Sequence, residues 1–247
     1  MKNNLNTFNT FNMAALFFSA AILASGCIEH ELPVDPRAPG LTETSEVDLG
    51  ADYAQRIYFD LPSASVVDSH DKLAWDLAFS SSAEIPTVRL NSARFSGLAS
   101  TGLSTISAAL TEEEFSALAW QYDAEEGAHV ATAASPGGTL ILGELMIIKL
   151  GYDLDNTPMG SVRLMIDSVT SSAYHFRYAP YDQPELVETA AVPFDAERHW
   201  LHFSFTAAAT VALEPPADQW QLLFTQYTAL LDGTTSYLVT GVLTPNP

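Results

Sequence analysis

The chain has 247 residues, of which 47% are hydrophobic and only 16% are charged, so we expect one large or two small domains with a substantial core. The formal net charge is −20, from 30 acidic and 10 basic side chains. Such a charge repels the phosphates of nucleic acids and the headgroups of anionic lipids, so neither is an expected partner.

An apolar run near the N-terminus predicts an export signal. Met13–Ala24 ("MAALFFSAAILA") has the length of a signal-peptide core and is too short to span a bilayer. The run ends in "LASGC" (Leu23–Cys27), which resembles the lipobox of bacterial lipoproteins, where the cysteine receives a diacylglycerol group and becomes the mature N-terminus. Cys27 is the only cysteine, so it cannot form an internal disulfide. We expect residues 1–26 to be a lipoprotein signal peptide and Cys27 to be lipidated; an ordinary cleaved signal is the alternative.

The residues after Cys27 predict where the protein lies and how it is held. Ile28, rather than an aspartate, follows the cysteine, which resembles lipoproteins sorted to an outer membrane. The expected location is therefore extracytoplasmic, with the lipid chains as the only membrane anchor. Residues 27–46 contain three prolines and no hydrophobic period, which is typical of a flexible tether.

Residues 47–247 predict an all-β, mostly antiparallel domain with one short helix. Short apolar runs rich in β-branched and aromatic residues alternate with Gly, Pro, Asp and Asn. One segment, "LTEEEFSALAWQYD", breaks this pattern, because Thr111 and Glu114 form a capping box and apolar residues then recur at helical spacing. We expect a helix over residues 112–121.

The segments that follow predict regular strands. In "SVRLMIDSV", Val162, Leu164 and Ile166 share one face, and the preceding "GELMIIKL" predicts a hairpin whose turn lies at residues 153–161. In "SAYHFRYAP", three aromatic residues alternate with His175 and Arg177. The segment "YLVTGVL" predicts a final strand.

One sequence segment occurs twice in the chain, and we call it the doubled phrase. Ile57–Phe79 ("IYFDLPSASVVDSHDKLAWDLAF") aligns with Leu201–Phe224 ("LHFSFTAAATVALEPPADQWQLLF") with one inserted residue. Each copy predicts a three-strand meander that ends in a tryptophan strand. The spacing places Trp75, Leu77 and Phe79 on one buried face, and Trp220, Leu222 and Phe224 likewise. Two such copies can cover each other or extend one sheet.

These residues resemble the HmuY-like lipoproteins, a family of haem-binding outer-membrane proteins. The resemblance rests on "YFDL" at residues 58–61, "WDLAF" at 75–79 and "VRLNS" at 88–92 with Gly97 downstream. The segment from Gln219 to Leu243 looks like the closing part of longer members. The resemblance implies an HmuY-like, mainly β fold in which haem lies between two loops. Two axial side chains, His and His or sometimes Met, would hold its iron.

Haem requires imidazole or thioether ligands on either side of an apolar slot. His129 lies in the Gly-rich stretch "DAEEGAHVATAASPGG", and Met159 lies in the "NTPMGS" turn, so these two are the candidate iron ligands. His70, in the turn of the first copy, is a third candidate haem-binding residue, although a position on a surface turn is the favoured interpretation of this residue. His199 and His202 have opposite parity on one strand and cannot share a metal without a bulge.

Other chemistry finds little support in the sequence. "YDLDNTPMG" begins like a calcium loop, but Pro158 stands where that loop needs glycine and Leu164 where it needs a bidentate glutamate. No nucleophile elbow, zinc-protease motif or phosphate loop occurs, so we do not expect an enzyme. An aromatic platform for a glycan or a protein is an alternative, built from four residues: Trp120, Trp200, Tyr227 and Tyr237.

The sequence thus predicts an outer-membrane-anchored lipoprotein that binds haem or a related porphyrin for uptake and passes it to a TonB-dependent receptor. The alternative is a surface lipoprotein of the same fold without an iron site, which binds another small ligand, a glycan or such a receptor.

Overall fold

The computed structural model of the protein describes residues 40, 44–81, 84–123, 132–231 and 235–245. The chain divides into two units, Met1–Thr42 and Glu43–Pro247, and every element described here belongs to the second. Cys27 and His129 lie outside the described residues. The described part contains no helix that is both long enough and apolar enough to cross a membrane.

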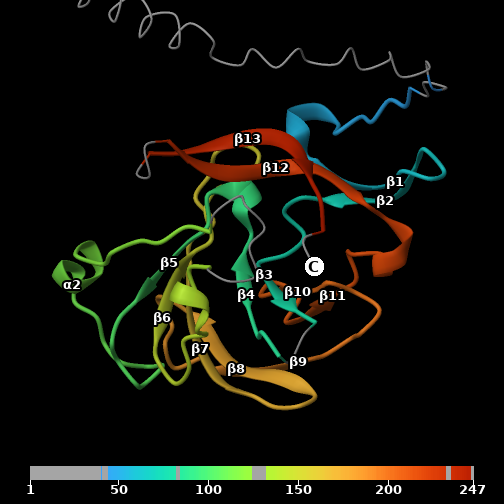
Figure 1. The fold of residues 1–247 in the computed structure, drawn as a ribbon. Helices are drawn as coiled ribbons and strands as arrows, with labels where there is room; N and C mark the ends of the chain where they lie inside the picture. The colour runs from blue at the N-terminus through green and yellow to red at the C-terminus, as the bar shows by residue number, and fades with distance from the viewer. Residues whose placement is uncertain (1–39, 41–43, 82–83, 124–131, 232–234, 246–247) are drawn as a thin grey trace, which may run out of the picture. The chain divides into compact units, whose positions relative to one another are not determined.

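Three antiparallel sheets build this unit, so the predicted all-β class with one short helix is confirmed (Figure 1). Sheet A has the order β13 (Thr235–Leu243), β12 (Leu222–Leu231), β1 (Gln55–Asp60), β2 (Ser65–Asp71). Sheet B has the order β11 (Ala209–Val211), β10 (Trp200–Ser204), β3 (Leu77–Ser80), β4 (Val88–Leu90). Sheet C has the order β5 (Gly97–Ser100), β6 (Met146–Lys149), β7 (Ser161–Val169), β8 (Ala173–Pro180), β9 (Glu188–Pro193). Short 3-10 turns lie at Ala51–Tyr53, Ser92–Arg94, Pro136–Gly138 and Ala217–Gln219.

The main core lies between sheets B and C. The alternating residues of β7 and β8 point into it as predicted, including Leu164 and Phe176, which are fully buried. They meet Leu77, Phe79 and Phe203 of sheet B. Sheet B therefore covers sheet C with one face, and its other face is turned toward sheet A (Figure 1).

The predicted helix is shorter than expected. α2 covers only Glu112–Ser116, although the capping box between Thr111 and Glu114 is present. The helix stops because the apolar residues after it pack onto the outer face of sheet C, around Leu145 and Met165, and this needs a more extended chain.

The two copies of the doubled phrase exchange strands, so the predicted three-strand meanders are wrong. In each copy the first two strands form a hairpin, β1–β2 and β10–β11. The third strand, however, pairs with the other copy: β12 with β1, and β3 with β10. The registers are equivalent, since Ile57 faces Phe224 and Leu201 faces Phe79. The copies are thus related by an approximate twofold axis.

The hairpin turns repeat this equivalence in detail. Each turn contains an alanine in the left-handed region, Ala64 and Ala208, and both have φ of 51°. Each of these residues donates its N–H to the carbonyl three positions earlier, Leu61 and Phe205. Two turns of the same conformation at aligned positions support a duplicated unit rather than a chance likeness of strands.

A bend directly after each tryptophan breaks the predicted alternation. The chain bends at Asp76 and at Gln221. Trp75 therefore packs with Ala78, away from Leu77 and Phe79, which enter the core toward sheet C. The prediction that each tryptophan shares a face with the next two apolar residues is wrong, because the bend shifts the side-chain parity by one position.

Candidate functional site

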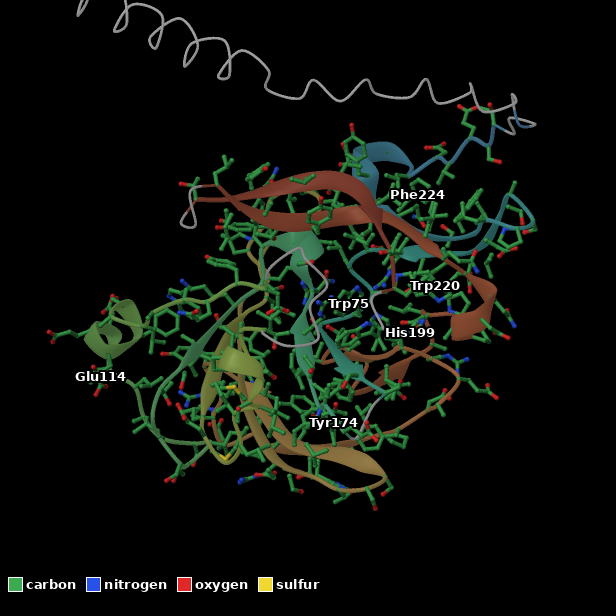
Figure 2. The ribbon with its side chains drawn as sticks, viewed as in Figure 1. Trp75, Glu114, Tyr174, His199, Trp220 and Phe224 are labelled. Carbon is green, nitrogen blue, oxygen red and sulfur yellow. The ribbon has the colours of Figure 1, made fainter. Side chains whose placement is uncertain are left out.

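A pocket of about 410 Å³ lies between sheets A and B, on the approximate twofold axis. Five pairs of equivalent positions from the two copies and their neighbouring strands line it: Arg56 and Trp200, Tyr58 and His202, Trp75 and Trp220, Ala78 and Leu223, Arg89 and Leu243. Its volume falls within the range of small-molecule sites. Figure 2 shows Trp75 and Trp220 in this region, with His199 close by.

The bends described above aim the two tryptophans at the pocket. The N–H of Asp76 donates to the carbonyl of Phe203 at 2.8 Å, and the N–H of Gln221 donates to that of Phe59 at 3.0 Å. Their side chains accept equivalent backbone N–H groups, from Phe205 and Leu61. Asp76 and Gln221 thus fix the two bends, and each bend directs the indole of the preceding tryptophan into the pocket.

Each tryptophan packs edge-on against the aromatic ring that the other copy supplies. The ring centroids of Trp220 and Tyr58 are 4.8 Å apart at an interplanar angle of 76°. Those of Trp75 and His202 are also 4.8 Å apart, at 85°. Edge-to-face contacts of this kind hold rings in fixed orientations, so the apolar wall of the pocket is largely preformed.

The polar groups of the pocket are not symmetric. The first copy supplies the buried Arg56, whose Nη2 donates to the Tyr58 hydroxyl at 2.6 Å and whose Nη1 lies 3.2 Å from His202 Nε2. Its guanidinium also lies 5.2 Å from the centres of the Tyr58 and Trp75 rings. Arg56 makes no ion pair with a carboxylate among the described residues.

Glu214 is the carboxylate on the pocket wall. It accepts the backbone N–H groups of His199 and Trp200 at 2.8 and 3.1 Å. Burial raises the pKa of Glu214 to about 7, although these N–H groups and the charge of Arg56 act in the opposite direction. Near neutral pH its negative charge is therefore only partly present.

His202 is the imidazole inside the pocket, and it is 3% exposed. Burial, together with the nearby charges of Arg56 and His70, holds the pKa of His202 well below its ordinary value. The ring is therefore neutral at pH 7. Its Nδ1 has no hydrogen-bond partner among the described residues.

Of the predicted haem-binding residues, the structure describes His70 and Met159. His70 lies on strand β2, where its Nε2 is 3.1 Å from Asp68, and not in a turn as predicted; Lys72 to Ala74 form that turn instead. Met159 lies beside Arg94, whose Nη1 is 3.6 Å from the sulfur atom. Neither lines the central pocket, and His129 falls outside the described residues.

The described residues do not fit a haem site with two axial ligands. His202 is the imidazole in the pocket, and no second imidazole and no thioether among the described residues lines it. The described part also contains no group of three or more His, Cys, Asp or Glu side chains that could hold a metal ion. The pocket offers indole rings and buried cations rather than a ligand pair.

The predicted aromatic platform is not assembled either. Trp200 lines the pocket with Arg89 at 4.8 Å from its ring centre, whereas Trp120 packs with Phe115 and beneath Lys149 on sheet C. Sequence reasoning did not identify Arg56 or the pocket role of His202. The aligned copies carried a signal, because both residues lie next to the first aligned position.

Comparisons of the chain with protein-family models, curated protein sequences and solved structures give no match.

Proposed function

We propose that this chain is a lipid-anchored, extracytoplasmic binding protein that holds a small ligand in the pocket between sheets A and B. The observation that supports this most strongly is the convergence of Trp75, Trp200 and Trp220 on one preformed pocket, with polar groups at defined positions. Small-molecule sites combine an apolar, aromatic lining with a few fixed polar groups in this way.

Binding can be measured with protoporphyrin IX, which has a large flat apolar body and no iron. The expected result is saturable quenching of tryptophan emission, because the ligand lies against the indoles. Leu223→Trp, which fills the pocket, should abolish the quenching. Leu222→Trp places the same side chain at the neighbouring position, outside the pocket lining, and should retain it. Equal quenching in both variants would argue against this pocket as the site.

Haem is the second candidate ligand, since His202 places an imidazole in a tryptophan-lined pocket. Hemin ligated through His202 should give a shifted Soret band that is lost in His202→Ala. A Soret spectrum identical to that of free hemin, combined with saturable binding of protoporphyrin IX, would favour the same fold without an iron site.

The proposed anchor is tested separately. We expect Cys27→Ser to prevent lipidation and to move the protein from the outer-membrane fraction to a soluble one, with pocket binding unchanged. We propose a TonB-dependent outer-membrane receptor as the partner that receives the ligand. A neighbouring gene for such a receptor would support uptake without identifying the cargo.

A further inference from the structure

Arg56 places a cation inside the pocket without a salt bridge to any carboxylate among the described residues. The residue is 6% exposed, and its Nη groups contact two neutral partners, the Tyr58 hydroxyl and His202 Nε2. His202 is held neutral, and Glu214 forms no ion pair with Arg56. Removing a guanidinium from water is unfavourable unless an anion compensates it, and the negative charge of Glu214 is only partly present near neutral pH.

Three polar nitrogen atoms in the same wall lack partners among the described residues. Arg56 Nε, Trp220 Nε1 and His202 Nδ1 are buried without a hydrogen bond among the described residues, and all three residues line the pocket. Buried N–H groups are almost always paired in folded proteins. Their concentration at one pocket indicates that acceptor atoms belong there.

The lining around this cation is apolar and flat. Trp75 and Trp220 come from equivalent positions on either side of the axis, and the position equivalent to Arg56 is occupied by Trp200. The pocket therefore combines the guanidinium of Arg56 with indole rings from both copies. A ligand that satisfies both must be anionic at one end and flat and apolar at the other.

We propose that the pocket selects an aromatic carboxylate, with the carboxylate beside Arg56 and the ring against the tryptophans. This inference rests on the proposed binding function and specifies its ligand class. A negative charge a few ångströms from the guanidinium stabilises it in this low-dielectric setting, and small side-chain rotations bring the unpaired N–H groups to the oxygens.

The test compares three probes of one shape by calorimetry with the purified protein: 2-naphthoate, the neutral 2-naphthylmethanol and the cationic 2-naphthylmethylamine. We expect the acid to bind at least about tenfold more tightly than the alcohol, and the amine to bind most weakly. Arg56→Gln should remove the preference for the acid. Arg177→Gln, at an arginine on sheet C that pairs with Asp167, is the matched control and should leave the preference unchanged.

The outcomes separate the two proposals. Equal binding of acid and alcohol would overturn the carboxylate inference and leave the binding pocket intact. If Arg56→Gln does not fold, the comparison of the three probes on the unaltered chain still decides the matter. If none of the three probes binds, the aromatic ligand class is overturned, and protoporphyrin IX quenching alone then tests the binding function.

Discussion

Glu214 gives the pocket a group that changes charge near neutral pH. Its pKa in the folded chain is about 7, mainly because burial disfavours the carboxylate, whereas the ordinary value is 4.5. Since the folded chain binds this proton more tightly than the unfolded chain does, the contribution to stability is present at low pH. It is lost as the pH rises from about 4.5 to about 7.

We therefore expect Glu214→Gln to gain stability relative to the unaltered chain as the pH rises. The difference in free energy of unfolding should grow by about 3 kcal/mol between pH 4.5 and pH 8, measured by denaturant titration. His202 has the opposite effect, because its depressed pKa costs stability as the pH falls below 6.5. Both proteins contain His202, so its effect cancels. Glu185→Gln, on an exposed turn, is the control variant for replacing a carboxylate by an amide.

The same carboxyl group should make anion binding pH-dependent. Besides Arg56, the groups that act on Glu214 are Arg198 and the backbone of His199 and Trp200. Burial lowers the pKa of both His199 and His202, so these rings stay neutral above pH 6.5. Between pH 8 and pH 6.5, the affinity for 2-naphthoate should rise as Glu214 gains its proton. In Glu214→Gln the affinity should be constant over this range, and a parallel rise in both proteins would contradict the assignment.

At the scale of single elements, the two hairpin turns allow a direct test of the duplication. Ala64 and Ala208 adopt left-handed backbone conformations, which cost a residue with a Cβ atom about 1 kcal/mol. Ala64→Gly and Ala208→Gly should each stabilise the chain by about 0.5 kcal/mol, because glycine removes this strain at some cost in chain entropy. Thermal unfolding measures the gain. Ala207→Gly, one residue earlier and outside the left-handed region, should be destabilising.

The strands show which parts of the fold the periodicity of the sequence could predict. The alternation in residues 161–180 predicted both the strands and their buried faces, since a continuous strand keeps strict parity. The same reasoning failed at Trp75 and Trp220, because the bends at Asp76 and Gln221 are held by hydrogen bonds to another part of the chain. The helix was overestimated for a similar reason, since packing on sheet C overrides local helical spacing after Ser116.

The candidate site could not be predicted from the sequence, because the exchange of strands between the two copies creates it. Arg56 and His202 are 146 positions apart and meet only because β1 pairs with β12 while β10 pairs with β3. The doubled phrase revealed two related units, but nothing in their pattern showed that each would complete the other's sheet. His70, which was predicted to lie in a turn, instead lies on strand β2, beside the strand that carries Arg56.

For the whole molecule, strand exchange leads us to expect that neither half folds by itself. A fragment of residues 1–196 keeps β2 and β4 but lacks β12 and β10, the second partners of β1 and β3, so we expect red-shifted tryptophan emission and no cooperative unfolding. Adding residues 197–247 in trans should restore the blue-shifted emission of the intact chain. A fragment that unfolds cooperatively without this addition would contradict the exchanged arrangement.

The approximate twofold axis has a consequence for how the pocket can evolve. Two identical chains that exchanged their third strands in this way would have to offer matching side chains to both ends of whatever they enclosed. Once both halves are encoded in one gene, each can mutate alone, so one half can hold a guanidinium where the other holds an indole. Fusion of the two copies into one chain thus permits an asymmetric pocket, which can distinguish the two ends of a bound molecule.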